Sequence, residues 1–170
     1  REHLDYYTVE ELAEIVRINA AKLNTPISAG ACIELARRSR GTPRVANARL
    51  HWARIYAAAK GDGTITEQVA HDSLDMAQVD ADGLDKNDRK YLEVLIDVFG
   101  GGPTGVDAIS ATMNVATDTL SDEIEPYLLR EQFLSRTPRG RMALPKAWTV
   151  VGRAMPKPKA DEKAGPSLFE

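Results

Sequence analysis

Residues 106–144 read VDAISATMNVATDTLSDEIEPYLLREQFLSRTPRGRMAL, and this stretch decides the fold of the second half of the chain. Residues 106–113 and 117–130 each show the apolar spacing of a short helix, and three residues separate them. Residues 132–136 and 141–144 alternate as two short strands around a turn that contains Pro and Gly. Two helices across a short turn, followed by a hairpin, predict a winged helix.

A leading helix is predicted over residues 85–98, and it ends at the run Gly100-Gly101-Gly102-Pro103. The glycine run suggests a phosphate loop at first sight. However, it follows a helix instead of a strand and the sequence contains no Gly-Lys dipeptide, so a structural turn is favoured. We therefore expect a second domain over residues 84–153. Residues 154–170 are rich in Pro, Lys, Ala and acidic residues without periodicity, which predicts a disordered tail.

The first 80 residues predict a separate bundle of four short helices, beginning near residues 9, 29, 43 and 67. Each of these helices follows a Ser or Thr suited to capping, and the first has Thr8 and Glu11 in the spacing of a capping box. In the third helix Thr42 is the expected N-cap, and Pro43 occupies the first helical position, where its missing amide hydrogen costs nothing. We expect the apolar residues of the fourth helix to face inward, namely Val69, Ala70, Leu74 and Met76. The whole chain is therefore expected to be mainly α.

The composition bounds the function. The 170 residues are 43% hydrophobic and carry a net charge of −3, which excludes both a disordered acidic chain and a uniformly basic nucleic-acid wrapper. The single cysteine, Cys32, lies in a helical pattern and fits a reducing compartment. No apolar run approaches the roughly 20 residues that span a membrane, so we expect a cytoplasmic protein without membrane contact. Because the chain begins at Arg1, we expect it to be part of a longer protein.

Two basic segments are candidates for binding anions. Arg37, Arg38 and Arg40 end the second helix, where cations complement the helix dipole. Arg44 differs, because it falls in the first turn of the third helix and opposes the dipole there. Such an arginine beside exposed amides suits an anionic ligand such as a phosphate, although an ordinary surface cation remains the alternative.

The second basic segment is residues 130–153, where Glu131 is the only acid among six cations: Arg130, Arg136, Arg139, Arg141, Lys146 and Arg153. The hairpin arginines could contact duplex backbone, or could simply keep a solvated turn soluble. The preceding helix carries acids that oppose entry into a major groove: Asp118, Asp122, Glu123 and Glu125. Binding is therefore expected through the hairpin, to phosphates, and largely independent of sequence. The three histidines show no metal-ligand spacing, so we expect no metal site.

Several motifs together resemble the RuvB family, the bacterial AAA+ motor ATPases of Holliday-junction branch migration. The resemblance covers about residues 3–153 and rests on five stretches: Ala36–Asn47, Asp88–Lys90, Phe99–Asp107, Ile124–Leu128 and Arg136–Arg141. It implies that residues 1–80 are an AAA+ lid and residues 84–153 a winged-helix DNA-binding domain. It also implies a large ATP-binding domain before Arg1.

The resemblance further implies roles for particular residues. Arg44 falls on the sensor-2 arginine, which responds to nucleotide phosphates, and Tyr7 falls on a tyrosine that lines the nucleotide site. Arg136 and Arg141, together with Arg139, fall on the DNA-contacting hairpin. One departure is that Val115–Thr117 replaces an acidic-acidic-Arg run that is usual in the family.

The implied activity belongs to the whole motor, with ATP and Mg²⁺ as cofactors, and we expect this chain alone to be inactive. The implied partners are duplex DNA at Holliday junctions, RuvA, RuvC and sister subunits in a hexameric ring, in recombination, repair and the SOS response. A stand-alone winged-helix regulator is the alternative, and it would prefer one operator sequence. A third possibility is a pair of protein-interaction modules without nucleic-acid contact.

Overall fold

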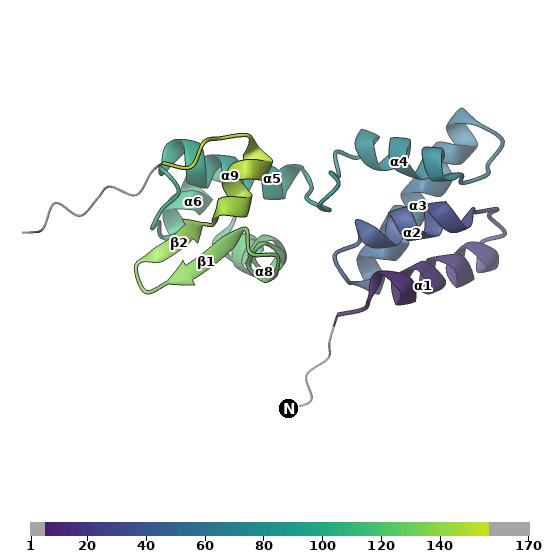
Figure 1. Ribbon diagram of the computed structural model, residues 1–170, viewed down its shortest axis with the longest axis horizontal. Coiled ribbons are helices and arrows are strands. Elements are labelled where there is room, and N and C mark those ends of the chain that lie inside the picture. The colour runs from purple at the N-terminus through teal and green to yellow at the C-terminus, as the bar shows by residue number, and fades with distance from the viewer. Residues whose placement is uncertain (1–5, 157–170) are drawn as a thin grey trace, which may run out of the picture. The chain divides into compact units, whose positions relative to one another are not determined.

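The computed structural model describes residues 6–156 and divides the chain into two compact units (Figure 1). The division falls between Lys90 and Tyr91. The predicted tail lies mostly outside the described residues, and residues 154–156 are exposed and belong to no helix or strand. Among residues 6–156, no helix combines the length and the apolar character that a membrane span requires.

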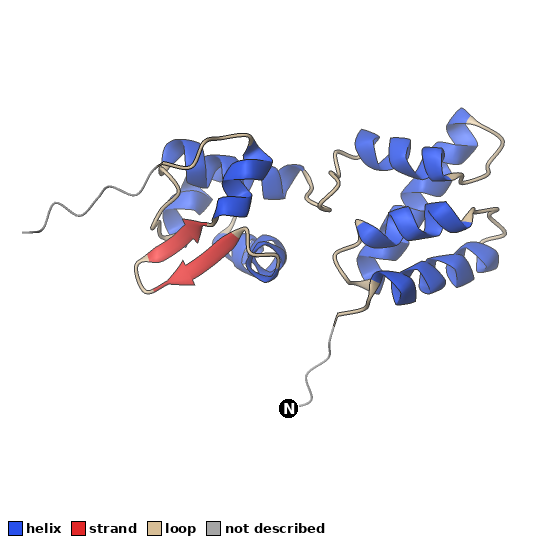
Figure 2. Ribbon diagram, viewed as in Figure 1, coloured by secondary structure: helices blue, strands red, loops and turns tan. Residues whose placement is uncertain are grey.

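Four helices form the first unit: α1 (Val9–Lys22), α2 (Ala29–Arg37), α3 (Pro43–Lys60) and α4 (Glu67–Met76) (Figure 2). The predicted capping box is present, because the Thr8 hydroxyl accepts from the Glu11 amide and the Glu11 carboxylate accepts from the Thr8 amide. Ser28 and Thr66 cap α2 and α4 as expected. The predicted four-helix bundle is confirmed.

The core of the first unit consists of residues spaced three or four apart on the facing sides of these helices. On α1 the buried positions are Leu12, Val16 and Ala20. The expectation for Met76 is wrong, because its side chain is 62% exposed. The buried face of α4 carries Leu74, and a residue two positions further on points to the opposite side of a helix.

The second unit begins with the end of a helix that both units share. Helix α5 (Lys86–Glu93) continues as a π-helical turn, η1 (Val94–Val98). A short turn with Asn114 in the left-handed conformation joins α6 (Val106–Met113) to the next helical stretch. That stretch consists of α7 (Thr117–Thr119), the π turn η2 (Leu120–Ile124) and α8 (Glu125–Arg130). Two strands and α9 (Pro145–Val151) complete the unit.

The π turn η2 has a cause in the sequence. Pro126 lacks an amide hydrogen and its ring would clash with the carbonyl four residues earlier in a regular helix. Widening the preceding turn accommodates the proline without ending the helix. Helix α9 was not predicted, since it has only seven residues, and it packs through Ala147 and Trp148.

The predicted hairpin is present as β1 (Leu134–Thr137) and β2 (Gly140–Ala143), which pair antiparallel. The glycine run packs its backbone against β2. A Cβ atom on Gly102 would lie 2.1 Å from the Arg141 carbonyl oxygen, and Thr104 exchanges two backbone hydrogen bonds with Arg141 (3.0 and 2.7 Å). The prediction of a structural turn at this run is confirmed, and the turn fixes one side of the hairpin. The helix-turn-helix with its hairpin confirms the predicted winged helix.

Candidate nucleotide-sensing and DNA-contacting sites

Arg44 and Tyr7 lie near the N-terminus of α3. The Tyr7 amide donates to the Gly41 carbonyl at 3.0 Å, which holds the segment before α1 against the turn that leads into α3. Arg44 is exposed in the first turn of α3, and Tyr7 is 47% exposed. Within residues 6–156 the Arg44 side chain has no ion-pair partner. The structure therefore brings the two predicted nucleotide-site residues to one end of the first unit.

The N-terminus of α3 has no side-chain cap, so the expectation that Thr42 caps this helix is wrong. Thr42 occupies the capping position, but its hydroxyl lies 3.4 Å from the Ser39 carbonyl and makes no bond to a first-turn amide. Pro43 has no amide hydrogen, so the amides of Arg44 and Val45 face outward without a capping oxygen. Helix N-termini with open amides attract anions. Arg44 adds a full positive charge at the same place.

The arginines at the end of α2 do more than complement the helix dipole. Arg38 is buried and pairs with Glu34, and its Nη1 atom donates to the Val79 carbonyl at 3.0 Å. Arg40 donates to the Gly83 carbonyl at 3.0 Å and to Asp85 at 2.9 Å, and it also bonds Asp88. Apart from the Glu34 pair, sequence spacing could not show these contacts, because the partners lie 41 to 48 residues away.

Asp88 is fully buried at the start of α5, and burial raises its pKa to about 6, although the charge of Arg40 opposes the shift. One carboxylate oxygen of Asp88 accepts from Arg40 and from the Asp85 amide, whereas its other oxygen has no hydrogen-bond partner in the described chain. The Arg40 and Asp88 pair thus fastens the first turn of α5 to the end of α2.

The hairpin register determines where its arginines lie. Arg136 on β1 is directly opposite Arg141 on β2, so the two side chains share one face of the hairpin. That face covers Glu125, which is fully buried at the start of α8. Arg136 donates to Glu125 through Nε at 2.9 Å, and Arg141 donates to it through Nε at 2.9 Å. The Tyr91 hydroxyl donates to the same carboxylate at 2.9 Å.

Hydrogen bonding keeps Glu125 charged. Burial alone would raise its pKa, but the bonds from Arg141, Arg136 and Tyr91 hold the pKa below its ordinary value. The same carboxylate raises the pKa of Arg141. Burial and the neighbouring charge of Glu125 raise the pKa of Tyr91, so its hydroxyl stays a donor. The cluster is a carboxylate with two guanidinium groups and a phenol.

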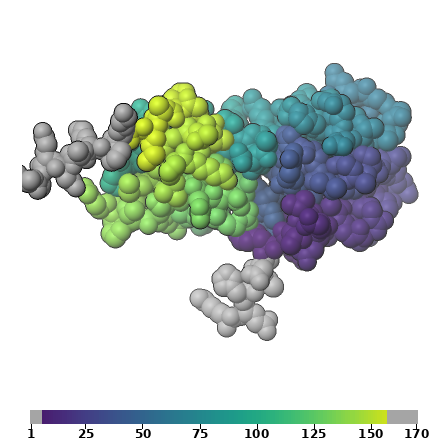
Figure 3. All heavy atoms as spheres, viewed as in Figure 1, coloured from purple at the N-terminus to yellow at the C-terminus, as the bar shows by residue number. Residues whose placement is uncertain are grey.

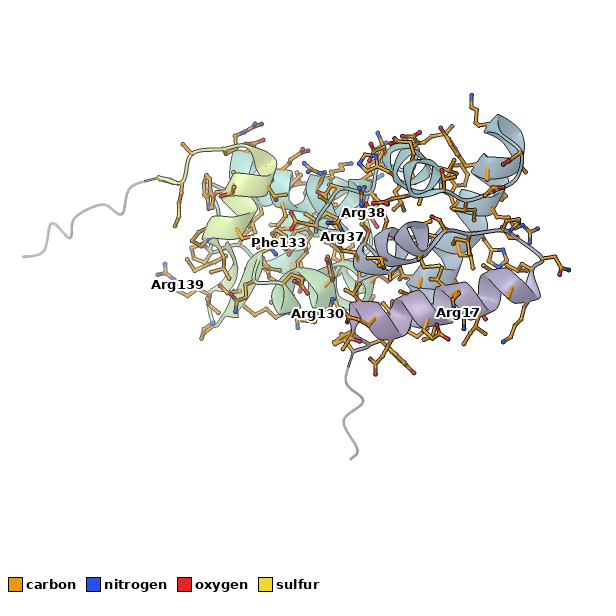
Figure 4. The ribbon with its side chains drawn as sticks, turned by 45° about the vertical axis from the view of Figure 1, so that its right-hand side comes forward. Arg17, Arg37, Arg38, Arg130, Phe133 and Arg139 are labelled. Carbon is orange, nitrogen blue, oxygen red and sulfur yellow. The ribbon has the colours of Figure 1, made fainter. Side chains whose placement is uncertain are left out.

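Arg139 lies in the turn of the hairpin and points away from the unit (Figure 4). The hairpin reaches the edge of its unit on the face drawn in Figure 3. Five of the six cations of residues 130–153 pair with Glu125, Glu131 or Asp97. Arg139 is the one whose side chain has no such partner between residues 6 and 156. The structure thus separates Arg139 from Arg136 and Arg141, which the sequence analysis grouped together.

The acidic face of the second helical stretch needs one correction. Asp118, Asp122 and Glu123 are exposed as expected, but Glu125 is buried and belongs to the arginine cluster. A signal was present in the sequence, because Glu125 lies three residues before the apolar Leu128 and so shares its helical face. Thr117, the last residue of the run Val115–Thr117, has its hydroxyl 3.3 Å from the Asp107 carboxylate and 3.3 Å from the Ser110 hydroxyl.

The acidic, histidine and cysteine side chains of the described residues bear on metal binding and on thiol chemistry. Residues 6–156 contain no group of three or more His, Cys, Asp or Glu placed to hold a metal ion. Cys32 is buried in the core of the first unit, and burial raises its pKa. A buried thiol with a raised pKa is a poor nucleophile, so Cys32 acts as a core residue of this unit.

The two units together have the architecture of an AAA+ lid followed by a winged helix. Residues 7–80 match the family described as the RuvB AAA lid domain, and residues 81–152 match the RuvB C-terminal winged helix domain. The chain belongs to the RuvB family.

Relatives and solved structures support this assignment. The chain is 53% identical over 156 residues to the Holliday junction branch migration complex subunit RuvB of Rhodopirellula baltica, which covers 92% of this chain and 43% of the relative. It is 48% identical to the same subunit of Anaeromyxobacter sp. strain Fw109-5, over 94% of this chain and 46% of the relative. The RuvB Holliday junction branch migration motor of Thermotoga maritima superimposes with a TM-score of 0.86 at 38% identity, over 90% of this chain and 51% of that structure. The chain spans about half the length of these proteins.

Proposed function

We propose that this chain is the lid and DNA-contacting part of an ATP-driven motor that moves duplex DNA and drives branch migration of Holliday junctions. The observation that carries the proposal is that the similarity to RuvB runs through both units, covering 90% of the chain in the comparison with the Thermotoga maritima motor. The domain that binds and hydrolyses ATP would lie in the half of the relatives that this chain does not cover.

The first unit would respond to the nucleotide. Arg44 presents a guanidinium without an ion-pair partner among residues 6–156, beside open helix amides, an arrangement that fits an ATP phosphate. Tyr7 would line the same site from the segment tied to Gly41. Bound ATP would supply the free energy of phosphate hydrolysis. Because residues 6–156 offer no cluster of acids for a metal, Mg²⁺ would be held by the larger domain.

The second unit would contact the DNA backbone through Arg139, with Arg136 and Arg141 beside it. A contact to phosphates suits a motor that must pass over any sequence. In the cell, the working assembly would be a cytoplasmic hexameric ring of sister subunits that acts with RuvA and with RuvC at junctions. The exposed Asp118, Asp122 and Glu123 would keep the second helical stretch out of the major groove.

The nucleotide half of the proposal is tested by replacing Arg44. The chain is joined to the ATPase domain of the Rhodopirellula baltica relative, and ATP turnover is measured with duplex DNA present. We expect R44A to lower turnover about 100-fold, the usual cost of losing one preorganised charge at a reacting phosphate. R17A, which removes an exposed cation paired with Glu14, should leave turnover unchanged. Equal turnover in R44A and R17A would exclude a role for Arg44.

The DNA half is tested with the chain alone, which should not hydrolyse ATP. It should bind duplexes of unrelated sequence with equal affinity, and R139A should reduce the slope of log affinity against log salt by about one. Preference for a single sequence would support a stand-alone regulator instead. No binding to any duplex, at low salt, would favour a protein-interaction module.

A further inference from the structure

We infer that Glu125 is the positioning residue of the DNA-contacting hairpin, and that it fixes both strands so that Arg139 is presented to a phosphate. This inference rests on the proposed DNA contact. Arg136, Arg139 and Arg141 are therefore not equivalent DNA-contacting residues, because the main role of Arg141 is to hold the two strands of the hairpin to Glu125. Tyr91, at the start of the second unit, takes part in the same arrangement.

The hydrogen-bond geometry shows that Glu125 has both oxygens saturated. Its Oε1 atom accepts from Tyr91 at 2.9 Å and from Arg141 at 2.9 Å. Its Oε2 atom accepts from Arg136 at 2.9 and 2.5 Å and from Arg141 at 3.2 Å. One buried side chain therefore bonds both strands of the hairpin and the preceding helix α5. Rigid presentation of a contact residue depends on such a supporting layer.

The charges explain why the carboxylate is needed. Arg136 and Arg141 occupy directly opposite positions on the two strands, where like charges destabilise a hairpin. Glu125 lies between them and removes the repulsion. The cluster keeps one net positive charge, and Arg136 is its more exposed cation, with a side chain 48% exposed against 18% for Arg141.

The direction of the Arg139 side chain, in the turn of the hairpin, depends on the hydrogen bonds that Glu125 makes to both strands. Arg139 lies between the two paired positions, with only Thr137 and Gly140 closing the strands around it. Its amide is bonded to the Thr137 hydroxyl at 3.3 Å, but its side chain has no ion-pair partner among residues 6–156. If the strands below it separate, Arg139 loses its defined direction. Glu125 therefore controls the turn although it does not touch it.

Glu125→Gln distinguishes positioning from simple charge. The substitution removes a negative charge from a DNA-binding region, so electrostatics alone predicts tighter binding. Positioning predicts weaker binding, by about tenfold at roughly 0.1 M salt for each DNA phosphate that the hairpin no longer neutralises. Glu131→Gln is the matched control, since it removes an equal charge from the same segment without touching the cluster. We expect E131Q to bind as tightly as the unmodified chain or more tightly.

Two further measurements keep the test decisive. Hydrogen exchange of the amides of residues 134–143, without DNA, should speed up in E125Q and stay unchanged in E131Q. If E125Q does not fold, Tyr91→Phe is used, because it removes one bond to Glu125 and keeps both ion pairs. We then expect a smaller acceleration of exchange in the same residues and a smaller loss of affinity.

The outcomes separate this inference from the proposed function. Unchanged hairpin exchange together with unchanged or tighter DNA binding in E125Q, or in Y91F where E125Q does not fold, overturns the positioning role. Failure of the unmodified chain to bind any duplex overturns the DNA contact instead. Hydrogen exchange would still decide in that case whether Glu125 orders the hairpin.

Discussion

Asp88 in the first unit and Glu125 in the second are both fully buried carboxylates that pair with arginine, yet their pKa values shift in opposite directions. Burial raises the pKa of Asp88 to about 6, and the charge of Arg40 offsets this only in part because the charges of Asp85 and Asp80 raise the pKa as well. One oxygen of Asp88 has no hydrogen-bond partner in the described chain. The pKa of Glu125 stays below its ordinary value because three side chains donate hydrogen bonds to its two carboxylate oxygens. The number of donors, and not burial alone, decides whether a buried acid stays charged.

The difference has a structural meaning as well. Asp88 pairs with Arg40 and so holds the start of α5 to the end of α2. Burying the Asp88 carboxylate costs desolvation free energy, and its hydrogen bonds offset this cost only in part. Glu125 has hydrogen-bond donors on both of its oxygens, so its burial is better compensated. We therefore expect the Arg40–Asp88 contact to stabilise the first unit less than the Glu125 cluster stabilises the second unit.

The largest effect is expected from Glu125→Ala. It leaves Arg141 mostly buried without a counter-charge and the Tyr91 hydroxyl without an acceptor, so the second unit should lose about 3–5 kcal/mol of unfolding free energy. Urea unfolding followed by Trp148 fluorescence measures this, in a Trp52→Phe background where Trp148 is the only tryptophan.

Glu123→Ala provides the control for that measurement. Glu123 is an exposed acid of the same helical stretch, and its replacement should change the unfolding free energy by less than about 0.5 kcal/mol. The two variants should differ clearly in unfolding free energy. If the losses in E125A and E123A agree to within about 1 kcal/mol, roughly twice the effect expected for a surface residue, the Glu125 cluster does not stabilise the second unit.

A second effect should appear in the pH dependence of Asp88→Asn. The folded pKa of about 6 exceeds the ordinary 3.8, so folding binds a proton between these values. The unfolding free energy of the unmodified chain should therefore fall relative to D88N as pH rises from about 4 to 6, by roughly 3 kcal/mol. Trp52 fluorescence in a Trp148→Phe background follows the first unit.

Glu125→Gln should show the opposite sign when the pH dependence of unfolding is followed by Trp148 fluorescence in a Trp52→Phe background, which reports on the second unit. Because the folded pKa of Glu125 is below its ordinary 4.5, its contribution is present above that value and is lost as pH falls through the folded pKa. The unmodified chain should thus gain stability relative to E125Q with rising pH. Parallel pH profiles for D88N and E125Q would mean that the two acids do not differ in the way the hydrogen bonds indicate.

The sequence predicted what is local and missed what joins distant residues. The capping box of Thr8 and Glu11 and the hairpin turn around Pro138 each lie within a few residues, and both were confirmed. The pairing of Glu125 with Arg141 spans 16 residues, and that of Arg40 with Asp88 spans 48. Counting charges along residues 130–153 gave the correct composition. It could not show that Asp97 and Glu125 come from outside the segment to neutralise part of it.

The roles of Arg44, Tyr7 and the hairpin arginines remain predictions, although the structure places them favourably. Arg44 could be singled out because its charge opposes the dipole of α3, which is a local property. The distinction between Arg139 and its neighbours could not be predicted, since all three lie in one short basic run. It depends on the strand register and on a carboxylate from another helix.

The smallest effect is expected from Arg153 and Asp97, which form a bidentate pair at 2.9 and 3.0 Å. The hydrogen-bond distances match those between Arg141 and Glu125, but both side chains are exposed, at 51% and 41%. A double-mutant cycle of R153A with D97A should give only a small coupling energy, because water screens the charges of exposed pairs. Raising the salt to about 1 M should remove most of it. The same cycle on R141A and E125A should retain its larger coupling energy in salt, since those charges are shielded from solvent. Equal coupling energies for the two pairs would show that hydrogen-bond geometry, and not burial with full donor saturation, sets the strength of the Glu125 cluster.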